Sequence, residues 1–142
     1  MLPTALYSYI SNTASITNLI GSGTSCRLYP GGAEQDETRP YIVYYIISDL
    51  EYHILTGAEG MSQARVQLEC WADTYLAAHQ MADTVRKALD GYQGYWETTI
   101  IKKCFLDNQT DSVYDDPEKH EDRIYGVLCD YSIMYDKQKP YM

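Results

Sequence analysis

Histidine, cysteine and clustered acidic residues are the types in this sequence that could bind a metal or act in catalysis. His53, His79 and His120 stand far apart, and His79 follows Asp73 by six residues, which is not a same-face spacing on a helix. The cysteines are equally scattered and include no C-x-x-C pair, at positions 26, 70, 104 and 129. Because zinc sites need ligands at short spacings, neither residue type predicts a metal centre.

Acidic residues do cluster, between positions 107 and 122, where seven Asp or Glu residues occur. A calcium loop of the EF-hand type needs a central glycine and a terminal glutamate. Here the glycine is missing and Pro117 interrupts, so a solvated charged loop is expected. The chain also lacks G-x-S-x-G, H-E-x-x-H and any complete phosphate-loop pattern. We therefore expect no metal, no cofactor and no catalytic residues, and hence no enzyme.

The whole chain has the size and composition of one globular domain. Its 142 residues are 45% hydrophobic and 22% charged, close to the globular average, and we expect one domain over residues 1–142. No apolar run approaches the roughly 20 residues of a membrane helix. The N-terminus lacks the regions of a signal peptide, so an intracellular protein without a membrane partner is expected. The formal charge of −9 disfavours tight binding of nucleic acid, whose affinity comes mainly from Lys and Arg.

Hydrophobic spacing in the first half predicts a helix followed by strands. The first twenty residues are expected to be helical, with Thr4 as a cap, a break near residues 11–13 and a restart capped by Ser15. A short strand is expected over residues 26–29. The β-branched and aromatic run at 41–48 predicts a strand covered on both faces. A long hairpin connection is then expected over residues 49–62, because it contains Gly57 and Gly60.

The second half begins with a half-buried strand over residues 63–72, in which apolar and polar side chains alternate. Asp73 is expected to cap a helix over residues 74–89. Strands are expected at 97–106 and 123–135, with a loose tail at 136–142. Cys70 and Cys129 alternate with apolar residues of their strands and are expected to be buried, reduced thiols of the core. The order α-β-β-β-α-β-β predicts an α+β fold, with two helices packed on a mainly antiparallel sheet.

Three segments, taken together, resemble the tail terminator or tail completion (tail-to-head joining) proteins of long flexible-tailed bacteriophages. These segments are CRLYP at 26–30, RPYIVY at 39–44, and VQLECWADTY at 66–75, which leads into the helix. The likeness extends over residues 6–135, and the acidic stretch 107–122 departs from it most. The resemblance implies a structural virion protein that carries no cofactor and performs no reaction.

For function, the resemblance implies a homo-oligomer, in the form of a hexameric ring at the head-proximal end of the tail. Such a ring docks on the major tail tube protein, terminates tube polymerisation and meets the head–tail connector or stopper protein. DNA passes through its lumen without specific binding. The implied location is the tail and neck of the virion, and the host cytoplasm during assembly.

Two groups of residues are candidates for contacts in such a ring. Glu69 and Trp71 lie on the strand face opposite Val66 and are candidates for subunit contacts, and the 15 tyrosines suit such interfaces. Six copies of a chain of charge −9 would carry −54, so acidic residues near the lumen would repel DNA. The hairpin 49–62 or part of 107–122 is expected to face the lumen or the tube. The candidate lumen residues are Asp115, Asp116, Glu118 and Asp122.

Three other functions remain open from the sequence. The nearest alternative is another ring-forming neck protein, such as a head-completion or stopper adaptor, which would share the ring symmetry and the acidic charge. A small intracellular enzyme predicts His, Asp or Cys clustered at strand ends, and the sequence offers no such cluster. A small binding module predicts a monomer that does not assemble with increasing concentration.

Overall fold

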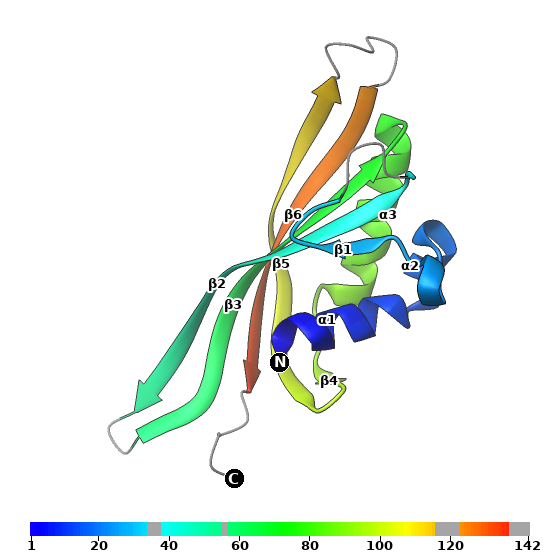
Figure 1. The fold of residues 1–142 in the computed structure, drawn as a ribbon. Helices are drawn as coiled ribbons and strands as arrows, with labels where there is room; N and C mark the ends of the chain where they lie inside the picture. Colours follow the sequence, from blue (N-terminus) through cyan, green and yellow to red (C-terminus); the bar gives the residue numbers. More distant parts are fainter. Residues whose placement is uncertain (34–37, 55–56, 116–122, 137–142) are drawn as a thin grey trace.

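The computed structural model describes residues 1–33, 38–54, 57–115 and 123–136, with side chains excepted at 52–60. Within these ranges, three α-helices and one short 3₁₀ helix accompany a six-stranded sheet of order β1-β2-β3-β6-β5-β4 (Figure 1). The helices are α1 (Leu2–Ser11), α2 (Ala14–Ile20), η1 (Gly23–Ser25) and α3 (Tyr75–Leu89). The strands are β1 (Leu28–Pro30), β2 (Tyr41–Ile54), β3 (Gly57–Ala72), β4 (Gly94–Trp96), β5 (Thr99–Asp115) and β6 (Arg123–Asp136).

The expected α+β architecture is confirmed, with three α-helices instead of two. All strand pairs are antiparallel except β1 with β2. Figure 1 shows the three helices on one side of the sheet and the β2–β3 and β5–β6 hairpins reaching toward opposite ends of the molecule. In the described ranges, every helix falls short of the length and hydrophobicity needed to span a membrane.

The expected helix break is confirmed, but both predicted caps are wrong. The Asn12 side chain donates to the Ser8 carbonyl and Thr13 Oγ1 donates to the Tyr9 carbonyl, so polar groups satisfy the end of α1. The second helix begins at Ala14 with Thr13 as its N-cap, not Ser15. Thr4 lies inside α1, because Pro3 suits the first turn of a helix and the helix already begins at Leu2.

The two hairpins are longer than the sequence pattern predicts. Residues 49–62, expected to be a connection, are mostly strand, and pairing continues from Asp49↔Ala64 to Ile54↔Gly57. In the expected acidic loop, residues 107–115 belong to β5, whose pairing with β6 reaches Asp115↔Arg123. Residues 116–122 lie outside the described ranges. In both places, backbone pairing with a neighbouring strand overrides the turn-like or polar character of the residues.

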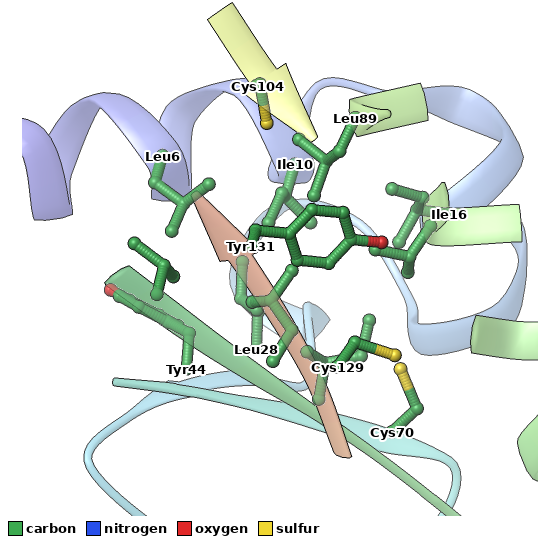
Figure 2. Close-up of a cluster of buried hydrophobic side chains, with 14 of the residues drawn as sticks. Leu6, Ile10, Ile16, Leu28, Tyr44, Cys70, Leu89, Cys104, Cys129 and Tyr131 are labelled. Atoms are coloured by element: carbon green, nitrogen blue, oxygen red, sulfur yellow. The ribbon is translucent and has the colours of Figure 1, made fainter. Parts of the chain in front are cut away.

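The core lies between the helices and one face of the sheet (Figure 2). The expected faces are confirmed, since α3 buries Ala78, Met81, Ala82, Val85 and Leu89. The matching face of β3 is buried at the even-numbered residues 62–72, and so are the odd-numbered residues 127–135 of β6. Tyr131 stands at the centre of this cluster, with Cys70 and Cys129 close by. All four cysteines are buried and free, as expected for Cys70 and Cys129.

The structure also corrects several element boundaries, adds one strand, and narrows the expected cover of β2. The short strand runs over Leu28–Pro30, and Asp136 closes β6, whereas residues 137–142 lie outside the described ranges. The short strand β4 was not expected; it pairs with the start of β5 through a tight turn in which Glu97 has a φ of 55°. The predicted strand 97–106 therefore begins at Thr99. The cover on both faces that was expected over residues 41–48 is limited to the buried residues Ile42, Val43 and Tyr44, whereas Ile47 is 51% exposed.

The cap of α3 is Thr74 and not Asp73. Thr74 Oγ1 accepts a hydrogen bond from the Ala77 backbone N–H at 3.1 Å. Asp73 instead pairs with the Arg39 guanidinium, Nε to Oδ1, at 2.5 Å. The Asp73 carboxylate therefore joins the end of β3 to the segment that enters β2.

Candidate functional site

The helices lie on one face of the sheet (Figure 1), and the opposite face, here called the open face, carries exposed large side chains. Strand register places Leu50, Phe105 and Tyr114 on the open face. Their partners on the neighbouring strands alternate with the residues that face the helices, so these side chains point the other way. Leu50 is 65% exposed, Phe105 43% and Tyr114 50%. These side chains lie at intervals along the face, since Phe105 pairs with Ser132 and Tyr114 pairs with Ile124, nearer the other end of β6.

Glu69 and Trp71 lie together on the open face. Trp71 Nε1 donates a hydrogen bond to Glu69 Oε1 at 3.1 Å, and both side chains are half-buried. The Trp71 indole packs directly on Gly126 of β6, where an added Cβ would come within 2.6–2.9 Å of three ring atoms. Sequence reasoning predicted that these two residues share a face, because they alternate on one strand. The contact of Trp71 with Gly126 depends on the β3–β6 register, so neither segment alone predicts it.

The middle of the open face is polar and internally paired. Gln67 Nε2 donates to Asp130 Oδ1 at 3.2 Å, and the Arg65 guanidinium lies 3.6 Å from Asp130 Oδ2. Ser132 Oγ donates to the Asp107 carboxylate. Burial, and then the Glu69 charge, raise the pKa of Tyr45 on neighbouring β2. The open face thus combines apolar side chains with an ordered polar strip, as protein interfaces do.

The β5–β6 hairpin carries the acidic residues that were assigned to the lumen. Asp115 ends β5, and its Oδ2 lies 3.8 Å from Arg123 Nε, with both side chains largely exposed. The other three candidates, Asp116, Glu118 and Asp122, lie outside the described ranges. The structure therefore places one of the four candidates, at the last residue of β5, where it pairs with Arg123 of β6.

Asp111 forms a contact with α3 that sequence reasoning missed. Tyr75 donates its hydroxyl proton to Asp111 Oδ2 at 2.8 Å, and His79 Nε2 lies 2.8 Å from Asp111 Oδ1. The Tyr75 and His79 rings also touch, with centroids 4.4 Å apart. The hydrogen bond to Asp111 is the main cause that raises the pKa of Tyr75. The first turn of α3 is thereby joined to the distal half of β5.

The described side chains form no cluster of three or more His, Cys, Asp or Glu suited to hold a metal ion. Burial is the main cause that raises the pKa of Cys104 and of Cys129 to about 12, so neither thiol ionises near neutral pH. A protonated, buried thiol is a poor nucleophile.

The comparisons with known proteins agree with this geometry. The family model "Tail completion protein gp17" matches residues 4–136. Among solved structures, a chain from "Virion of native gene transfer agent (GTA) particle" shares the fold, with a TM-score of 0.71 and 14% identity. That alignment covers 95% of this chain and 94% of the other. None of the curated proteins matches the sequence. The chain belongs to the tail completion protein gp17 family and is a structural protein of the phage tail, not an enzyme.

Proposed function

We propose that six copies of this chain form a ring at the head-proximal end of the tail tube. The ring terminates polymerisation of the major tail tube protein, meets the head–tail connector or stopper, and lets DNA pass. The subunits assemble in the host cytoplasm and remain in the neck of the virion. Family membership supports the assignment to the tail. Ring formation is what we propose in addition to that assignment.

The open face is the observation that carries the ring proposal. Its large side chains lie opposite the helices, and nothing in the described chain covers Phe105 or Tyr114 beyond about half of their surface. Trp71, held by Gly126 and Glu69, presents a rigid aromatic surface at low entropic cost. A closed ring needs two different surfaces on each subunit, and the open face supplies one of them.

Net charge supports an acidic lumen. Six copies would carry −54, and screening limits each charge to about 8–10 Å at physiological salt. Only acids close to the passing DNA would therefore act on it. The β5–β6 hairpin reaches toward one end of the molecule (Figure 1), and Asp115 is the last residue of its first strand, so we assign this end of the hairpin to the lumen.

Assembly of the purified chain tests the ring. Mass photometry of the chain, alone and with tail tube protein, should show a hexamer or a capped tube end, and a persistent monomer with no cap would contradict the proposal. Trp71→Ala should reduce assembly. Leu76→Ala is the matched control, because Leu76 is 66% exposed on the helix side. Equal assembly of both variants would remove Trp71 from the interface.

Genome ejection tests the lumen assignment separately. Replacement of Asp115, Asp116, Glu118 and Asp122 by Asn or Gln should slow ejection, because repulsion of the phosphates is lost. Neutralising Asp83 and Glu97, which lie outside the hairpin, should leave the rate unchanged. An unchanged rate in the hairpin variant would place the hairpin away from the DNA.

A further inference from the structure

Two adjacent lysines lie where strand β5 loses its outer neighbour. Strand β4 pairs with β5 only as far as Ile101, and the β5–β6 register shifts between Ile101 and Lys103, as in a β-bulge. Lys102 and Lys103, here called the edge lysines, are both exposed. Lys103 pairs with Met134, which is an open-face position of β6, so this lysine lies at the rim of the open face.

The edge lysines have no acidic partner among the residues that the structure describes. By contrast, the described arginines and Lys87 all contact a carboxylate or a backbone carbonyl. Acidic residues outnumber Lys and Arg in this chain by 20 to 11. Two adjacent cations without an acid, in so acidic a chain, form a surface that a negatively charged partner complements.

Glu69 on the open face carries the opposite charge. Its half-buried carboxylate accepts the Trp71 indole N–H at 3.1 Å, and no Lys or Arg of the described chain forms an ion pair with it. Its cross-strand neighbours are Val43, which is only 2% exposed, and Leu128. In such apolar surroundings water screens a charge poorly, so a cation that covers Glu69 interacts with it more strongly than on an open surface.

Glu69 and the edge lysines of one chain lie too far apart to pair with each other. Glu69 lies opposite Leu128 of β6, whereas Lys103 lies opposite Met134, on the other side of that strand. The stretch of β6 from Leu128 to Met134 spans about 20 Å, well beyond the reach of a lysine side chain. An ion pair between these groups must therefore join two copies of the chain. A closed ring joins different surfaces of neighbouring subunits, and these two sites are different surfaces.

We propose that the edge lysines of one subunit contact Glu69 on the open face of the next subunit. The contact rests on the proposed ring and assigns the second of the two surfaces that each subunit uses. Copies of net charge −9 repel one another, so local opposite charges decide which surfaces meet. Charged residues at a sheet edge also prevent unwanted strand pairing. Glutamate would serve that purpose as well as lysine, so charge reversal separates the two roles.

Two charge-exchange variants test the contact. The first carries Lys102→Glu with Lys103→Glu, and the second carries Glu69→Lys. Alone, each should need an at least about tenfold higher concentration than the parent chain to form hexamers, because like charges meet at every contact. An equimolar mixture should form hexamers with equal numbers of each variant, because opposite charges meet again in an alternating ring. Native mass spectrometry counts the copies, and a mixture without such hexamers would overturn the contact.

Two further variants control for indirect effects. Arg86→Glu with Lys87→Glu on α3 changes the net charge by the same amount as the first variant, and it should assemble like the parent chain. Glu69→Gln keeps an acceptor for the Trp71 indole and removes only the charge, so it should weaken assembly even if Glu69→Lys displaces the indole. If the α3 variant weakens assembly as much as the edge variant does, net charge is responsible and the proposal is wrong.

The outcomes also separate this contact from the ring. If each variant alone forms hexamers as readily as the parent chain, the ring stands and the edge lysines do not contact Glu69. If the parent chain stays monomeric, the ring fails, and capture of the second variant by the immobilised first variant decides the contact. Capture above the level between two parent chains supports the ion pairs, and equal capture overturns them.

Discussion

His79 Nε2 and Asp111 Oδ1 lie 2.8 Å apart, although 32 residues separate them in the sequence. The same carboxylate accepts a hydrogen bond from Tyr75 through its other oxygen. Asp111 belongs to the hairpin that we assign to the lumen, and its two aromatic partners belong to the N-terminal part of α3. The contact therefore ties the direction of this hairpin to a rigid helix.

Removing the Asp111 carboxylate should break the contact between the β5–β6 hairpin and α3. In Asp111→Ala, the pKa of Tyr75 should fall toward its ordinary value of 10.0, because the hydrogen bond to Asp111 is the first cause of its rise. NMR titration of labelled tyrosine measures this shift. Coupling between His79 and Asp111 in a double-mutant cycle should be at most about 1 kcal/mol, as for other exposed pairs. Asp83→Asn, on the same helix, should leave the Tyr75 titration unchanged.

The parts of the fold that follow from local periodicity were predictable. Residues 63–72 and 123–135 alternate, and 74–89 repeats apolar residues at helical spacing, so their buried faces follow from one segment at a time. Glu69 and Trp71 share a face for the same reason. The cap of this last helix differed because Thr74 follows Asp73 directly, and both side chains can accept hydrogen bonds from a helix end.

Strand lengths and side-chain contacts that depend on a partner strand could not be predicted from one segment of the sequence. Residues 49–54 and 107–115 contain acidic and turn-forming types, yet they extend long ladders because β3 and β6 supply backbone partners. The contact of Trp71 with Gly126 and that of His79 with Asp111 likewise depend on register between distant segments. No spacing in the sequence carries that information.

Gly126→Ala should destabilise the chain through Trp71. The new Cβ would lie 2.6 Å from the indole, so the ring must move, at a cost of about 1–3 kcal/mol, typical of overpacking. In a Trp71→Ala background the same substitution should cost little, because the obstacle is gone. Urea unfolding of the four chains gives the coupling. An equal cost in both backgrounds would mean that Gly126 is needed for its backbone, not for the indole.

Tyr131→Phe should stabilise the fold. The Tyr131 hydroxyl is buried and has no hydrogen-bond partner among the described residues, and burial raises the pKa of Tyr131 far above its ordinary value. Removing a buried, unpaired hydroxyl should raise the free energy of unfolding by about 1 kcal/mol. Tyr9→Phe is the control of opposite sign, because it deletes the hydrogen bond from the Tyr9 hydroxyl to the Ala88 carbonyl at 2.7 Å. If Tyr131→Phe is instead as destabilising as Tyr9→Phe, the Tyr131 hydroxyl has a partner in solution.

Stability should fall as pH rises above about 9. The thiols of Cys104 and Cys129 have pKa values of about 12 in the fold, against 9.0 as the ordinary value. At pH 10 the unfolded chain has therefore lost protons that the folded chain keeps, and folding must take them up again. Each thiol should cost about 1 kcal/mol of stability between pH 8 and pH 10.

Urea unfolding at pH 8 and pH 10 measures this loss, and Cys104→Ala isolates one thiol, because its cavity cost is the same at both pH values. The variant should therefore lose less stability than the parent chain over this interval. Cys26→Ala is the comparison. Burial also raises the pKa of Cys26, but the nearby Arg27 charge opposes the rise, so its removal should change the pH dependence less. An identical pH dependence in the parent chain and Cys104→Ala would mean that the Cys104 thiol ionises as readily in the folded chain as in the unfolded one.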